Sequence, residues 1–113
     1  MIKTFTGNEG IRNSAGNLLY GLVVMSSIRQ QAITVGVTAI PLPTTPMTRR
    51  ISLEILNNST GGQILYIGDS TVTTVNGRPI YPRAGMNLQI EDNVDIYGVS
   101  SAVGADIRVT EGN

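Results

Sequence analysis

The chain has 113 residues, the length of a single domain, and it contains 13 glycines, five prolines, no cysteine and no histidine. These absences exclude disulfide bonds, Ser-His-Asp or Cys-His catalysis, and the usual zinc ligands. The formal net charge is zero, whereas proteins that bind free nucleic acid normally present a net basic surface. We therefore expect a protein that is not an enzyme, has no metal or other cofactor, and does not bind nucleic acid.

The N-terminal part, residues 1–31, is rich in glycine, asparagine and serine and has no sustained helical period. It predicts an extended arm with one strand in its apolar run, Leu18 to Met25, which is either an anchor, another core strand, or both. That run is far shorter than the roughly 20 residues of a membrane span. Residues 25–32 have mixed helical character and predict at most one short helical turn. The first residues lack a basic segment followed by an apolar core, so we expect no secretory signal and synthesis in the cytoplasm.

From Ile33 onward, strand patterns recur about every ten residues, which is typical of an antiparallel β-sandwich or jelly roll of about seven or eight strands. We therefore predict one β-sandwich domain over residues 32–113. The predicted strands are Ile33–Ile40, Arg50–Leu56, Gln63–Gly68, Arg78–Tyr81, Met86–Ile90, Val94–Val99 and Ala105–Thr110. Alternate residues of a strand share a face, so the predicted core is Ile33, Val35, Val37, Leu53, Ile55, Ile64, Tyr66, Leu88, Ile90, Ile96, Ile107 and Val109.

The segments between these strands predict how the chain turns. Three prolines in residues 41–46 remove backbone donors, so this segment should cross between two sheets. The Asn57–Gly62 cluster predicts a tight reversal that pairs its two flanking strands as a hairpin. Asn76 and Gly77 suit a type I′ turn, and Pro79 confines the strand that follows to a sheet edge, where it can pair with another copy.

Two short motifs carry groups that could do chemistry. Gly68-Asp69-Ser70 ends a predicted strand, but without a histidine to accept the serine proton we interpret it as a turn. Glu91, Asp92 and Asp95 offer oxygen ligands of the kind that calcium prefers, although their spacing is not that of a calcium loop. A turn is the favoured interpretation there too, and cation binding by these three residues is left open.

The pattern of strands and turns from Ile33 to Val109, about the last two-thirds of the chain, resembles small structural proteins of tailed bacteriophages. The segments that carry the resemblance are Thr34 to Pro43, Arg50 to Asn58, Tyr66 to Gly68, Val72 to Gly77, Pro79, Val94 to Val99 and Asp106 to Val109. The resemblance implies a small β-sandwich, made in the host cytoplasm, that binds the outer surface of the assembled phage head as a decoration or cement protein. Its implied partners are the major capsid protein or other virion proteins, and it is expected to form dimers or trimers. The alternative is a structural or host-binding module of the tail, baseplate or fibre.

The two parts of the chain differ in charge. Residues 1–50 carry a net charge of +4 and the remainder −4, which suits head-to-tail contact between copies or simply gives two solvated faces. We expect the arm to bind neighbouring subunits by apolar burial, with Lys3 and two arginines meeting acidic surface. The predicted partner-binding residues are Phe5, Arg12, Leu18, Leu19, Tyr20, Leu22, Val23 and Arg29.

Overall fold

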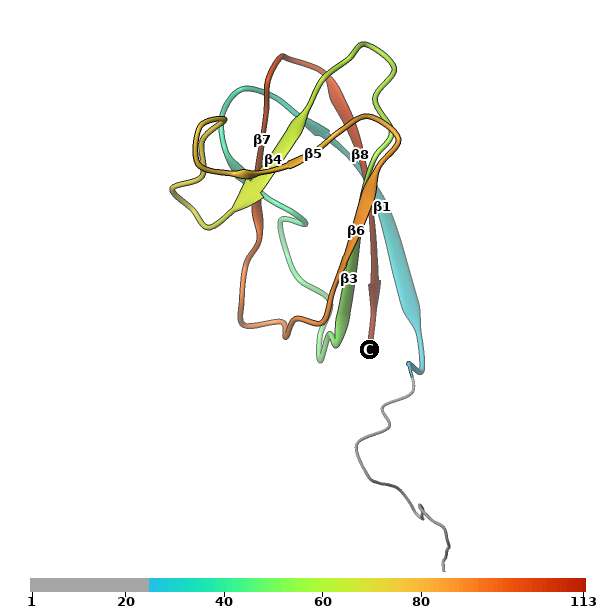
Figure 1. Cartoon of the computed structure of the whole chain (residues 1–113). Helices are drawn as coiled ribbons and strands as arrows, with labels where there is room; N and C mark the ends of the chain where they lie inside the picture. The colour runs from blue at the N-terminus through green and yellow to red at the C-terminus, as the bar shows by residue number, and fades with distance from the viewer. Residues whose placement is uncertain (1–24) are drawn as a thin grey trace, which may run out of the picture.

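The computed structural model describes residues 25–113, which form two antiparallel four-stranded sheets packed face to face (Figure 1). The strands are β1 (Ile28–Val35), β2 (Ile40–Pro41), β3 (Ser52–Asn57), β4 (Leu65–Gly68), β5 (Arg78–Ile80), β6 (Gly85–Leu88), β7 (Tyr97–Ser100) and β8 (Ala105–Gly112). The predicted all-β sandwich is confirmed. Residues 25–113 include no helix long and apolar enough to span a membrane.

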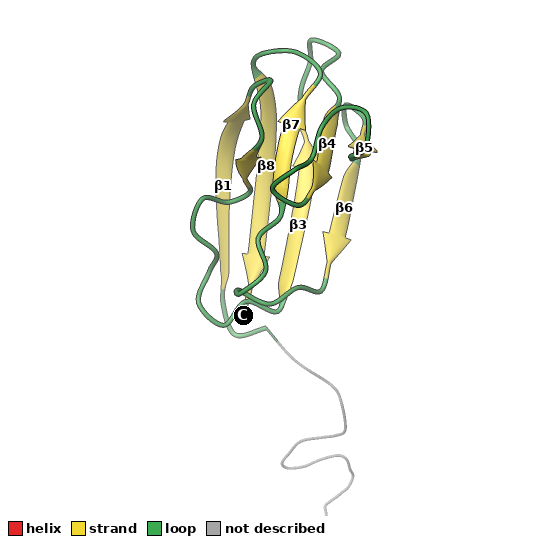
Figure 2. Ribbon diagram, turned by 90° about the vertical axis from the view of Figure 1, so that its left-hand side faces the viewer, coloured by secondary structure: helices red, strands yellow, loops and turns green. Residues whose placement is uncertain are grey.

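The first sheet has the strand order β1-β8-β3-β6 and the second has the order β2-β7-β4-β5 (Figure 2). Among these eight strands, only β4 and β5 are both consecutive in the chain and paired with each other. Every other connection carries the chain from one sheet to the other. The sandwich is therefore built from pairings between residues far apart in the sequence.

The connections confirm one prediction and correct another. Residues 41–46 lead from β2 in the second sheet toward β3 in the first, so the predicted crossing is confirmed. The predicted hairpin around Asn57–Gly62 is wrong, because β3 pairs with β6 and β8 while β4 pairs with β5 and β7. The buried Asn57 amide donates to the carbonyls of Gln63 and Ile80, both at 2.9 Å. Residues 57–62 therefore reverse the direction of the chain, but they do not determine which strand pairs with the segment that follows.

The turn before β5 is wider than predicted. Asn76 and Gly77 do not have the positive φ angles of a type I′ turn. Instead, Gly77 N–H donates to the Thr73 carbonyl at 2.9 Å, and Asn76 Oδ1 accepts from the Thr73 N–H at 2.7 Å. The placement of Pro79 is confirmed, because β5 is an edge strand of the second sheet.

The predicted helical turn over residues 25–32 is also wrong. β1 begins at Ile28 and pairs residue by residue with β8, from Ile28 with Gly112 to Val35 with Ala105. Pairing with a strand about 80 residues away overrides a weak local helical tendency. The boundary placed between residues 31 and 32 thus falls inside β1.

The core lies between the two sheets. Of the predicted core residues, Val35, Leu53, Ile55, Ile107 and Val109 are buried, while Ile33, Leu88, Ile90 and Ile96 pack against the core and are partly buried. The prediction that Val37 belongs to the core is wrong, because Val37 lies beyond the end of β1 and is 61% exposed.

In β4 the predicted inward face is wrong. Leu65 and Ile67 are buried, whereas Ile64 and Tyr66 are only partly buried. Ile64 precedes β4, and Tyr66 has the opposite parity to the buried pair. Because side chains alternate across a strand, choosing the wrong parity moves the whole set to the other face. The buried hydrophobic residues absent from the prediction are Leu42, Leu65, Ile67, Val72, Ile80, Val99 and Ala105.

Candidate functional site

Residues 25–27 join the end of the first sheet through hydrogen bonds to Asn113. Ser26 N–H donates to the Asn113 carbonyl at 2.6 Å, and Asn113 N–H donates to the Ser27 carbonyl at 3.1 Å. The Ser27 hydroxyl donates to Asn113 Oδ1 at 2.6 Å, while Asn113 Nδ2 donates to the Thr48 carbonyl at 3.1 Å. We call this region the entry end, because here residues 1–24 connect to the sandwich.

A cluster of buried charges lies beside the entry end. Glu111 in β8 is 1% exposed and Arg50, just before β3, is 2% exposed. Arg50 Nη1 donates to Glu111 Oε2 at 2.8 Å, and the Met47 N–H donates to the same oxygen at 3.0 Å. Arg29 in β1 donates to Glu111 Oε1 from Nε at 3.0 Å and also from Nη2. We call Arg29, Arg50 and Glu111 the Glu111 cluster.

The rest of the Arg50 guanidinium binds backbone carbonyls of the segment between β6 and β7. Nε donates to Ile90 at 3.3 Å, and Nη2 donates to Glu91 at 2.9 Å and to Val94 at 2.8 Å. A buried charge is tolerated when it is paired and its hydrogen bonds are satisfied. Arg50 meets both conditions, so the cluster ties β1, β8 and two connecting segments together.

The Glu111 cluster holds its carboxylate in the charged form. Burial by itself would raise the pKa of Glu111, but hydrogen bonds from Met47, Arg29 and Arg50 and the charge of Arg29 lower it below the ordinary value of 4.5. A carboxylate of lowered pKa that is enclosed by cationic donors is a poor proton acceptor. The cluster therefore suits a structural role better than acid–base chemistry.

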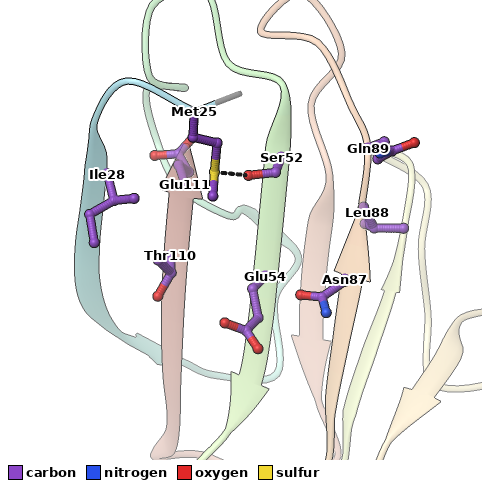
Figure 3. Close-up of a pocket in the computed structure, with 9 residues that line it drawn as sticks. All are labelled: Met25, Ile28, Ser52, Glu54, Asn87, Leu88, Gln89, Thr110 and Glu111. Atoms are coloured by element: carbon purple, nitrogen blue, oxygen red, sulfur yellow. Dashed lines mark hydrogen bonds between the residues drawn. The ribbon is translucent and has the colours of Figure 1, made fainter. Parts of the chain in front are cut away.

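A shallow groove lies on the outer face of the first sheet, next to the entry end (Figure 3). It has a volume of about 360 Å³ and combines apolar Met25 and Ile28 with polar groups that include Ser52, Glu54 and Asn87. Met25 lies across β8 where Gly112 has no side chain, and its sulfur is 3.2 Å from Ser52 Oγ. The groove thus begins at Met25, the first residue that the structure describes.

The two short motifs are turns. Asp69 Oδ1 accepts from the Thr71 N–H at 2.9 Å and from the Thr71 hydroxyl at 2.6 Å, and these bonds lower the pKa of Asp69. The interpretation of Gly68-Asp69-Ser70 as a turn is confirmed. In the acidic motif, Asp92 Oδ2 accepts from the Arg49 N–H at 2.7 Å. No group of three acidic residues within residues 25–113 is placed to hold a metal ion.

Of the predicted partner-binding residues, the structure describes one, Arg29, whose guanidinium binds Glu111 of its own chain and the Thr45 carbonyl, the latter at 2.6 Å. The other seven, Phe5, Arg12, Leu18, Leu19, Tyr20, Leu22 and Val23, lie outside the described residues.

Sequence reasoning missed Arg50 and Glu111 as a buried pair. A signal for Glu111 is present in the alternation of β8. Glu111 shares its parity with Ala105, Ile107 and Val109, which all face the core. A carboxylate at an inward position needs a cationic partner, and the Arg49-Arg50 pair supplies one.

Comparison with models of known protein families, with curated protein sequences and with solved structures finds no match to this chain.

Proposed function

We propose that the protein is a structural component of a tailed-phage virion that binds the assembled head as a decoration or cement protein and attaches through its N-terminal residues. The observation that carries the proposal is the way residues 25–27 are fastened to the sandwich. Five hydrogen bonds link Ser26 and Ser27 with Asn113. The Glu111 cluster then binds β1 to β8 just beyond that point.

This arrangement suits attachment through residues 1–24. A pull on Met25 is passed to β1, which pairs with β8 at eight successive positions. β8 in turn pairs with β3 at six positions. A force along such strands must break several hydrogen bonds together, so the sandwich should stay folded while its N-terminal residues hold a partner. Cementing a shell requires this kind of connection.

The composition of the N-terminal residues supports a protein partner. The run from Leu18 to Val24 contains six aliphatic or aromatic residues, and Lys3 and Arg12 outnumber the single acid, Glu9, in residues 1–24. Apolar contacts would supply most of the affinity, and the basic side chains would set register and association rate on an acidic surface. The major capsid protein is the proposed partner.

The test is incorporation into particles. Purified virions of the encoding phage should contain the chain in a fixed ratio to the major capsid protein, measured by quantitative mass spectrometry. Deleting residues 1–17 should leave a folded sandwich that no longer incorporates fully. The matched control is Val75→Ser, which changes a residue that is 93% exposed between β4 and β5.

Three outcomes would contradict the proposal. If the truncated protein occupies heads at the wild-type level, residues 1–17 are not the anchor. If density for the sandwich lies on the tail instead of the head, the tail or fibre alternative replaces the decoration role. Absence of the chain from purified virions would refute both.

A further inference from the structure

The four edges of the two sheets are protected to very different degrees. β2 has two residues, one of them Pro41, and β5 has three, one of them Pro79. β6 has four residues. Short strands and prolines are devices that stop a sheet edge from pairing with another chain. β1 is an edge strand of eight residues and contains no proline.

The backbone groups that β1 turns outward can be identified from the alternation of the ladder. In an antiparallel sheet, each residue of a strand bonds to the neighbour on one side only, and successive residues alternate. Asn58 N–H donates to the Asp106 carbonyl and Asn113 N–H donates to the Ser27 carbonyl. Even-numbered residues of β8 therefore bond toward β3 and odd-numbered ones toward β1.

It follows that the odd-numbered residues of β1 are paired with β8, while Gln30, Ala32 and Thr34 turn their N–H and C=O groups outward. Among residues 25–113, no backbone hydrogen bond from another segment reaches these three residues. All three are exposed. Within the part of the chain that the structure describes, this edge of β1 is thus a row of backbone donors and acceptors without a partner.

Side-chain charge does not block this edge. Arg29 is the sole charged residue of β1, and its guanidinium is turned inward onto Glu111. The exposed side chains along the middle of the strand are Gln30, Gln31, Ala32 and Thr34. Two copies of β1 can therefore approach each other without like-charge repulsion, and Ala32 near the centre takes little space.

We propose that β1 is an interface between two copies of this chain, in which the two strands pair antiparallel around Ala32 and join the two first sheets into one of eight strands. The partner of this edge is a second copy of the chain, because the outward N–H and C=O groups of β1 repeat every second residue and can pair with the same groups of another β1. Turned through a two-fold axis, the edge is complementary to itself. Gln30 would lie opposite Thr34 of the other copy, where their side chains can share a hydrogen bond. The pairing closes both edges, so it gives a dimer and not a fibre. This proposal does not depend on the function proposed above.

The expected dimer is weak. A single strand pair buries less surface than the roughly 1,200 Å² that marks the lower range of stable interfaces. Sedimentation of the full-length protein should therefore show a monomer–dimer equilibrium that depends on concentration. Ala32→Lys, an edge charge, should weaken dimerisation at least about tenfold. Its matched control is Asn87→Lys, which adds the same charge at an exposed position of β6, the opposite edge.

A second measurement locates the contact. Because the chain has no cysteine, Ala32→Cys introduces a single thiol, which should form a disulfide-linked dimer on mild oxidation. Asn87→Cys should not. Circular dichroism checks that each variant is folded. A full-length protein that is monomeric at every accessible concentration, for instance because another part of the chain covers the edge, overturns the proposal. So does a dimer that Ala32→Lys leaves unchanged.

Discussion

Replacing Arg50 with methionine tests the role of the Glu111 cluster. The change keeps a long apolar side chain in place but removes a guanidinium that makes four hydrogen bonds. Glu111 then keeps Arg29 and the Met47 N–H as donors. The carbonyls of Ile90, Glu91 and Val94 lose the donor that Arg50 supplied.

The expected loss of stability is large for one substitution. Removing one partner of a buried ion pair costs roughly 3–5 kcal/mol. Here the loss comes from weaker compensation of the buried Glu111 charge and from three carbonyls that no longer have the Arg50 donor. The total stability of a small domain is about 5–15 kcal/mol. Arg50→Met should therefore stay folded in buffer but unfold much earlier in urea, by about 2 M for a typical small-domain slope.

Urea unfolding followed by circular dichroism supplies the measurement, and Arg108→Met is the matched control. Arg108 pairs with Asp106 on the surface, with side chains 51% and 41% exposed. An exposed pair of this kind contributes about 0–1 kcal/mol. The double variant Arg50→Met with Glu111→Leu removes the buried carboxylate as well, so it should lose less than the sum of the two single changes.

If Arg50→Met costs no more than Arg108→Met, the Glu111 cluster does not stabilise the fold in the way described. If the double variant loses the full sum of the two single changes, Arg50 and Glu111 are not coupled.

Three further predictions concern stability. Because the pKa of Glu111 is lowered, the ionised carboxylate stabilises the fold at pH values above its ordinary pKa of 4.5, and this stabilisation is lost as the pH falls through the folded-state pKa. Glu111→Gln should therefore flatten the acid side of a curve of unfolding free energy against pH, and an unchanged slope would contradict this. Leu53→Ala, at a residue 1% exposed, should cost about 2–5 kcal/mol in urea unfolding, whereas Val37→Ala should change stability by less than about 0.5 kcal/mol; similar losses in both would show that the core is wrongly located. Gly98→Ala in β7 places a methyl group against the buried Leu42 side chain, so we expect a loss of about 1–3 kcal/mol, and a rise in thermal midpoint would contradict the packing.

The sequence alone was enough to establish the fold class. Recurrent alternation of apolar residues, many glycines and β-branched residues, and no long helical period specify strands, because the period of two is a property of the extended backbone itself. The edge position of β5 also followed from the sequence, since Pro79 cannot donate to a second neighbour. So did the crossing at residues 41–46. Each of these features depends on a residue's own backbone chemistry.

The tertiary structure decided which strands pair and which side chains meet. Residues 25–32 have no strong local preference, and β1 exists because β8 offers a partner strand about 80 residues away. The inward face of β4 could not be predicted from the sequence. Ile64, Leu65, Tyr66 and Ile67 are all large apolar residues, so no polar residue marks the outward positions. The Glu111 cluster joins residues separated by up to 82 positions. The alternation of β8 places Glu111 on the inward face, but it does not say which arginine Glu111 meets. Only the packing of the two sheets brings Arg29 and Arg50 to it.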